Sequence, residues 1–294
     1  MIYKDLKFGI EMEFTGITRK AAANVIGEYF GTGYRHTGEG YDAYVSYDTS
    51  GRKWSVMRDS SLRTEGGEQC ELVTPVLIFD DMPVLQEVIR QLRHKGAKSN
   101  ASCGFHVHLS APEEFNVKQL TRLINVVHSK QDLMYEALGV ISSRMHYCQK
   151  LPTELCERIQ SKKPTTVSAL ADIWYGVLNG GDNYSGHYNQ SRYYCLNLHN
   201  LFSGRQPTVE FRCANGSLRD ARVVRATIEL YALIVAYSFN ARSCSYKVKP
   251  PSGSHKYAFR VFMLKMGCIG DELAVCRKYI LQNMTGDTAW RQRC

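Results

Sequence analysis

Residues 7–14 read KFGIEMEF, and the strict alternation of apolar and polar side chains in this stretch decides the fold. Every second residue from Phe8 to Phe14 is large and apolar, whereas Glu11 and Glu13 occupy alternate positions. Because successive side chains of an extended chain point to opposite faces, the pattern predicts a strand with one face in the core and both carboxylates on the other. A half-exposed strand with a solvated acidic face would show the same pattern, so this motif alone does not establish a site.

Three later segments repeat this combination of an apolar face and a polar face. Their polar faces carry these groups: Glu71 in CELVTP (70–75), His106 and His108 in GFHVHL (104–109), and Glu210 and Arg212 in TVEFR (208–212). Glu68 lies three positions before Glu71 and shares its face only if a bulge intervenes, so Glu71 is the preferred candidate. Taken singly, each segment also fits a structural histidine or an exposed ion pair. Their coincidence on separate strands is what favours a functional site.

A shared metal site explains why acidic and imidazole groups recur on these strands. If the strands are neighbours in one sheet, their carboxylates repel one another unless cations lie among them. Oxygen ligands outnumber nitrogen ligands, which favours magnesium or manganese over zinc. Arg192 and Arg212 can bind phosphate oxygens through paired hydrogen bonds, so a nucleotide is the expected ligand. The chain has no GxxxxGKS loop and no GxGxxG turn before a helix, so metals and arginines must build the nucleotide site.

The remaining chain predicts an α+β protein, because its strands and helices do not alternate as in a doubly wound parallel sheet. A hairpin is expected from residues 41–47 and 53–57 around the turn-rich residues 48–51. Helices are expected over these ranges: Thr18 to about Phe30, Asp81 to about Gly96, Asn116 toward Gly139, Asp220 to Phe239, and about Glu272 to Gln282. The Gly-, Asn- and Ser-rich residues 179–191 predict a loop, either a plain connector or a lid over the site.

Composition and length limit the class of protein. The 294 residues are ordinary in composition and predict one domain over 1–294, with a helical extension at about 241–294. The longest apolar stretch, Leu230 to Phe239, is shorter than the roughly 20 residues of a membrane span. No secretory signal is recognised and the ten cysteines form no CxxC pair, so we expect a cytoplasmic protein with reduced thiols. The formal charge of +9 suits nucleic acid, acidic surfaces or phosphate ligands equally well.

Five segments carry a resemblance to a known family. They are FGIEMEF (8–14), RDSSL (58–62), CELVTPVL (70–77), CGFHVHLS (103–110), and RYYCLNL (192–198) followed by TVEFR (208–212). In these segments the sequence resembles the amidoligase family, within the wider glutamine synthetase-like group of carboxylate-amine ligases. The resemblance covers most of the first 220 residues. It implies a glutamine synthetase-like curved antiparallel sheet with flanking helices, in which metals on the concave side hold the phosphates of ATP.

The resemblance also implies roles for single residues. The positions that match metal ligands, with Glu68 as an additional candidate, are Glu11, Glu13, Glu71, His106 and Glu210. His108, Arg192 and Arg212 match positions that contact phosphate or the carboxylate substrate, and Asp59 matches a position that binds or deprotonates the amine. The implied reaction joins a carboxylate to an amine with ATP and Mg²⁺ or Mn²⁺, through an acyl phosphate. The ExE motif precedes DSS here, the reverse of the order in glutamine synthetase, which argues against an ammonia-using synthetase.

Three alternatives remain open at this stage. A guanidino or carboxylate kinase of the same architecture would phosphorylate its substrate without making an amide. A basic nucleic-acid-binding protein would use the +9 charge, although its carboxylate-rich strands would repel phosphates unless metal intervened. A site of two histidines and one carboxylate, formed by His106, His108 and Glu210, would bind iron or zinc. The carboxylate and amine substrates of the ligase could be small molecules or peptides.

Overall fold

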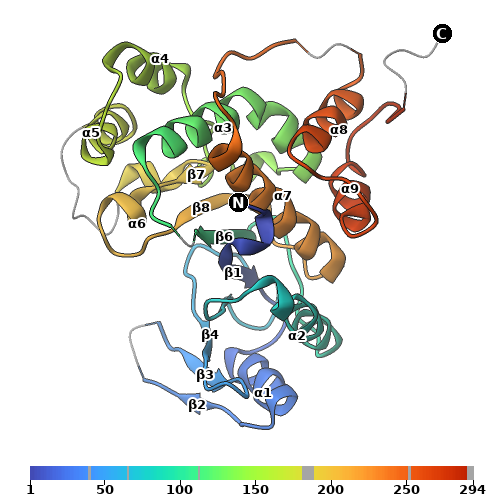
Figure 1. The fold of residues 1–294 in the computed structure, drawn as a ribbon. Coiled ribbons are helices and arrows are strands. Elements are labelled where there is room, and N and C mark those ends of the chain that lie inside the picture. The colour runs from blue at the N-terminus through green and yellow to red at the C-terminus, as the bar shows by residue number, and fades with distance from the viewer. Residues whose placement is uncertain (39–40, 65, 112, 181–188, 251–252, 290–294) are drawn as a thin grey trace.

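An eight-stranded antiparallel sheet runs through the middle of the molecule, in the order β2-β3-β4-β5-β1-β6-β8-β7 (Figure 1). The computed structural model describes residues 1–38, 41–64, 66–111, 113–180, 189–250 and 253–289. The strands are β1 (Lys7–Phe14), β2 (Arg35–His36), β3 (Tyr44–Tyr47), β4 (Lys53–Met57), β5 (Cys70–Val73), β6 (Gly104–Ser110), β7 (Leu196–Asn197) and β8 (Val209–Asn215). The predicted antiparallel arrangement is confirmed, and β1 lies between β5 and β6.

The helices pack around this sheet and against one another (Figure 1). They are α1 (Arg19–Phe30), α2 (Met82–His94), α3 (Val117–Leu138), α4 (Thr153–Lys162), α5 (Val167–Leu178), α6 (His199–Phe202), α7 (Ala221–Asn240), α8 (His255–Lys265) and α9 (Ala274–Ile280). The five helices expected from the sequence are confirmed as α1, α2, α3, α7 and α9, and the expected hairpin is β3–β4. Helices α4, α5, α6 and α8 were not predicted. Residues 181–188, most of the predicted loop, lie outside the described part.

The local signals for helix ends act as expected in all but one case. Asn116 forms a capping box with Gln119, since its side chain accepts from the backbone N–H of Gln119 and the Gln119 side chain accepts from that of Asn116. Thr18 and Asp220 cap α1 and α7 through their side chains, which accept from the backbone N–H groups of Ala21 and Arg222. Asp81 precedes α2, but its carboxylate pairs with Arg52 instead of capping the helix. This pair joins the β3–β4 hairpin to the start of α2.

The apolar faces of the strands meet the helices in one hydrophobic core. Phe8, Ile10, Met12 and Phe14 are at most 1% exposed and belong to this core, which confirms the orientation predicted for β1. Helix α7 is long and apolar enough to cross a membrane by length and composition, but 72% of its apolar window is buried inside the fold, as in the core helix of a globular protein. Within the described ranges the cysteines are free thiols, and all except Cys244 are buried.

Candidate active site

The register of four neighbouring strands brings the predicted polar side chains together. Glu13 lies opposite Glu71 across the β1–β5 pair, and Glu11 lies opposite His106 across the β1–β6 pair. On the next pair, His108 of β6 lies opposite Glu210 of β8. Directly opposed side chains on one face have Cβ atoms about 5 Å apart. The sheet therefore gathers acidic and imidazole groups from distant parts of the sequence on the face that turns away from the core.

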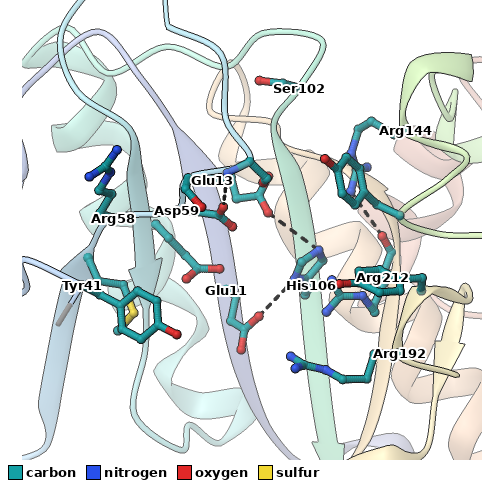
Figure 2. Close-up of a pocket in the computed structure, with 16 residues that line it drawn as sticks. Glu11, Glu13, Tyr41, Arg58, Asp59, Ser102, His106, Arg144, Arg192 and Arg212 are labelled. Atoms are coloured by element: carbon teal, nitrogen blue, oxygen red, sulfur yellow. Dashed lines mark hydrogen bonds and ion pairs between the residues drawn. The ribbon is translucent and has the colours of Figure 1, made fainter. Parts of the chain in front are cut away.

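Glu11 connects the two imidazoles. One carboxylate oxygen, Oε2, lies 3.0 Å from Nδ1 of His106, and the other, Oε1, lies 3.1 Å from Nε2 of His108. His106 is also 3.9 Å from Glu13, measured from Nε2 to Oε1. The dashed lines of Figure 2 show His106 between the two carboxylates of β1. One residue of the central strand thus fixes both histidines of the neighbouring strand.

Three overlapping groups of ligand atoms could hold metal ions. In each group, one ligand atom per residue lies within 4.8 Å of the others, and the groups are Glu11, His108 and Glu210; Glu11, Glu71 and His106; and Glu13, Asp59 and Glu71. Glu11 and Glu71 each belong to two groups, so the groups form one continuous cluster, called here the carboxylate–imidazole cluster. None of the three unites both imidazoles, although Oε1 of Glu210 lies 3.8 Å from Nδ1 of His106 and 3.9 Å from Nε2 of His108.

Burial and like charges act together on Glu71. Burial raises its pKa well above the usual value, and the charges of Glu11, Glu13 and Asp59 raise it further. The opposite holds for Glu11: burial opposes its ionisation, but the nearby His108 and His106 outweigh burial and hold its pKa well below the usual value. A divalent cation among these groups would offset the repulsion at Glu71. A donor set rich in carboxylates, with one imidazole in two of the groups and none in the third, suits Mg²⁺ or Mn²⁺.

The carboxylate–imidazole cluster borders a pocket with a volume of about 410 Å³. Arginine side chains form another wall of this pocket. Arg212 projects from β8, Arg192 from the short helix η4 (Gln190–Tyr193), and Arg144 from the short helix η3 (Ser142–Arg144). Figure 2 shows these arginines on one side of His106, with the carboxylates of Glu11, Glu13 and Asp59 on the other. Positive and negative walls in one pocket can bind a metal-nucleotide complex, because the metal needs carboxylates and the phosphates need cations.

Arg212 is tied to the cluster by an ion pair with Glu210, whose side chain is only 2% exposed. Burial opposes the charge of Arg212, but the Glu210 and Glu11 carboxylates outweigh it and raise the pKa of the guanidinium. The pairing of β6 with β8 has a bulge here, because Arg212 and Cys213 both stand opposite His106. Bulges commonly redirect side chains beside active sites.

Arg144 was not predicted from the sequence. It is 3% exposed, and its guanidinium donates to the carbonyl oxygens of Ala214 at 2.5 Å and Arg212 at 3.4 Å. Gly104 makes room for it, since a Cβ atom at that position would lie 2.4 Å from Nη2 of Arg144. The fold thus holds a buried cation beside the bulge. The sequence around it, SSRMHY at 142–147, offers no spacing that marks this residue.

The opposite end of the pocket is formed by the chain that leaves β4. Arg58, Asp59 and Ser61 of this segment line it together with Tyr41, which precedes β3, and Asp59 accepts a hydrogen bond of 2.7 Å from the backbone N–H of Ser61. Asp59 was predicted at the amine site, and the structure places its carboxylate next to Glu13 and Glu71. Its position therefore allows contact with either a metal ion or an amine.

Two predicted residues have neighbours different from those expected. Glu68, predicted as an additional metal ligand, lies apart from the three ligand groups: its carboxylate accepts from the backbone N–H of Arg19 at 2.9 Å and pairs with the Arg19 side chain at 3.2 Å. It stabilises the first turn of α1. His108 was predicted to contact phosphate or substrate, but the described pocket wall includes His106 and not His108, which lies in the group with Glu11 and Glu210.

The environment of His108 predicts how stability depends on pH when no metal is bound. Burial lowers its pKa, but the Glu210 and Glu11 carboxylates outweigh burial and raise it from 6.5 to about 9. A histidine with a raised pKa stabilises the fold fully below its unfolded-state pKa, and this contribution is lost as the pH rises through the folded-state pKa. The free energy of unfolding in EDTA should therefore fall by on the order of 1–3 kcal/mol as the pH rises from 6.5 to about 9.

Urea denaturation across this pH range checks the prediction. The variant His108→Gln should lack most of the fall, whereas His94→Gln, an exposed change at the end of α2, should keep the profile of the unmodified protein. An identical fall in the His108→Gln variant would show that other groups cause it.

Comparison with models of protein families places this chain in a family. Residues 4–235 match the model of a family described as “putative amidoligase enzyme”. Among curated proteins, none matches this chain. The matched range contains all the strands and every residue of the carboxylate–imidazole cluster. Because the match covers well over half of its length, this chain belongs to the amidoligase family, whose members are ligase-type enzymes.

Proposed function

We propose that this protein is an ATP- and magnesium-dependent carboxylate-amine ligase that forms an amide or isopeptide bond and releases ADP. One observation carries the proposal: a single pocket of about 410 Å³ is lined by most of the carboxylate–imidazole cluster (Glu11, Glu13, Asp59, Glu71 and His106) and by Arg144, Arg192 and Arg212. A ligase of this kind must hold a metal-nucleotide complex beside two further reactants. The resemblance of the segments around Glu11, His106 and Glu210 to the amidoligase family, within the glutamine synthetase-like group, supports the same reaction class.

The donor atoms fit Mg²⁺ or Mn²⁺ at the two ligand groups that share Glu11. These groups would hold the ions through Glu71 and His106 on one side and through His108 and Glu210 on the other. When bound, a divalent ion neutralises phosphate charge and makes the γ-phosphorus more electrophilic. Since Glu11 contributes to both groups, its loss disturbs every ion held there.

The arginines bind and orient the nucleotide phosphates in this proposal. Arg192 and Arg212 keep their charge at all working pH values and can each make paired hydrogen bonds to phosphate oxygens. Arg144 is buried and held by two backbone carbonyls, so its position is already ordered before substrate arrives. Ordered cations of this kind stabilise developing phosphate charge without reorganising during the reaction.

The reaction has two steps. A carboxylate oxygen of the substrate attacks the γ-phosphorus, the bond from that phosphorus to the ADP oxygen breaks, and an acyl phosphate forms. The amine nitrogen then attacks the acyl carbon, the C–O bond to phosphate breaks, and inorganic phosphate leaves. Asp59, beside Glu71 and Glu13 at the open end of the pocket, attracts the ammonium form of the amine and accepts its proton.

Isotope transfer tests this proposal directly. The protein is incubated with ATP, Mg²⁺, pooled carboxylic acids labelled with heavy oxygen, and pooled amines, and the products are identified by mass spectrometry. A ligase gives one new amide per ADP and places one heavy oxygen in each inorganic phosphate released with it. ADP release with a stable phosphorylated product and no amide would instead identify a kinase of the same architecture. The absence of any ADP release would contradict both.

A further inference from the structure

The positive charge of this protein is concentrated in a part of the chain that the cluster does not use. Residues 230–270 contain no Asp or Glu, and their Lys and Arg residues are Arg242, Lys247, Lys249, Lys256, Arg260 and Lys265. The family match ends at residue 235, so this basic stretch lies almost entirely beyond it. The family match therefore gives no information on the role of this basic stretch.

A groove of about 350 Å³ lies where this stretch meets α3 and α4, and we call it the basic groove. Its lining residues are Val117, Lys118, Thr121, Arg122, Asn125, Ile159, Gln160, Lys163, Pro164, Arg242, Ser243 and Cys244. Among them are Lys118, Arg122, Lys163 and Arg242, and none is acidic. The groove thus combines positive charge with apolar surface from Val117, Ile159 and Pro164.

Specific hydrogen bonds hold the wall of the basic groove that residues 242–246 form. Asn125 of α3 donates through Nδ2 to the carbonyl oxygen of Cys244 at 3.0 Å. One turn later, Nδ1 of His128 lies 2.8 Å from the carbonyl oxygen of Tyr246. Arg122 donates to the carbonyl oxygens of Ser238 and Phe239 at the end of α7, at 2.6 Å and 3.2 Å. These hydrogen bonds fix the position of the 242–246 segment against α3 and so define this wall of the groove.

One buried group in the basic groove has no partner. Asn125 is only 8% exposed, and its Oδ1 accepts no hydrogen bond from any residue within the described ranges. A buried acceptor without a donor costs about 1–3 kcal/mol. A ligand that satisfies this groove therefore brings an N–H or O–H donor for Oδ1 as well as negative charge for the surrounding cations.

The positive charge continues beyond the basic groove. Burial lowers the pKa of Lys130 of α3, whose ammonium lies 5.5 Å from the centroid of the Phe262 ring, and the charges of Lys265 and Lys249 lower it further. These like charges come from three separate elements, and a bound polyanion would relieve their repulsion.

We propose that the basic groove docks an acidic segment of a polypeptide. Its Asp or Glu carboxylates pair with Lys118, Lys163 and Arg242, a backbone N–H donates to Oδ1 of Asn125, and aliphatic side-chain atoms pack on the apolar lining. A peptide supplies all three kinds of contact. DNA lacks a donor on its phosphate backbone, and no aromatic ring lines the groove to stack on bases. This docking role does not depend on the proposed reaction.

Fluorescence anisotropy with a labelled peptide of alternating Glu and Leu tests the proposal. The groove variant carries Lys118→Gln, Lys163→Gln and Arg242→Gln, all at exposed positions. A matched control carries Lys20→Gln, Lys53→Gln and Lys95→Gln, which remove the same charge from exposed positions elsewhere. The groove variant should bind the peptide at least about tenfold more weakly than the unmodified protein, and the control should change Kd by less than about twofold.

Further arms of the same experiment separate the alternatives. A peptide of alternating Gln and Leu should not bind, and the amide-forming activity of the groove variant on small substrates should stay unchanged. Equal weakening in both variants would mean that only net charge matters and would overturn the proposal. Tighter binding of an oligonucleotide of equal charge, lost in the groove variant, would overturn the assignment to a peptide. Absence of peptide binding to the unmodified protein would also overturn it.

Discussion

Replacing Glu11 with glutamine is expected to lower ADP release by at least about a thousandfold, with little change in the fold. The carboxylate of Glu11 belongs to two of the three ligand groups and contacts both His106 and His108. Glutamine keeps the size of the side chain but removes the charge that a divalent ion requires. A coupled assay for ADP, run with the identified acid and amine, measures the loss, and circular dichroism checks the fold.

Glu68→Gln provides the matched control. This carboxylate lies a few residues from Glu71 in sequence, yet it serves the start of α1 through Arg19. The change should cost about 1 kcal/mol of stability, as for a lost helix cap, and leave ADP release within about threefold of the unmodified protein. If the two variants lose activity equally, the division between the cluster and Glu68 is wrong.

Replacing Arg212 with alanine is expected to lower the free energy of unfolding by about 3–5 kcal/mol in metal-free protein. Arg212 pairs with Glu210, whose side chain is 2% exposed, and the remaining hydrogen bond from Asn197, at 2.6 Å, is neutral. Removing the guanidinium therefore leaves a buried carboxylate without its main countercharge. Urea denaturation near neutral pH measures the effect.

Two comparisons show whether the buried charge causes this loss. Adding Glu210→Gln to the Arg212→Ala variant should recover much of the lost stability, because the uncompensated charge is then gone. Arg222→Ala breaks an ion pair with Asp220 in which the arginine side chain is 60% exposed, and it should cost less than about 1 kcal/mol. A loss of similar size for Arg212→Ala and Arg222→Ala would contradict the role given to burial.

Alternation along single strands predicted much of the candidate site. The side-chain period of two is a local property, so the sequence alone indicates that Glu11 and Glu13 share a face, and likewise His106 and His108. It does not give the register between strands, which decides that Glu11 stands opposite His106. The resemblance to the amidoligase family supplied the expectation that these strands meet.

The parts that the sequence did not predict depend on long-range contacts. Arg144, in the short helix η3, enters the pocket because Gly104 of β6 leaves space for it, and no local pattern encodes that contact. Alternation favoured Glu71 over Glu68 but could not name the partner of Glu68, and the fold pairs Glu68 with Arg19 while Glu71 joins the cluster. Helix α5 was missed because its sequence, VSALADIWYGVL, is apolar nearly all round and includes several strand-favouring residues.

Binding of Mn²⁺ to metal-free protein, measured by isothermal titration calorimetry, tests most directly the claim that the carboxylate–imidazole cluster holds divalent ions. The unmodified protein should show saturable binding that Mg²⁺ competes away, and the double variant Glu11→Gln with Glu71→Gln should lose it while remaining folded. Because this readout needs no substrate, it is independent of the reaction. Equal Mn²⁺ binding by the two proteins, or none by the unmodified protein, would contradict the claim.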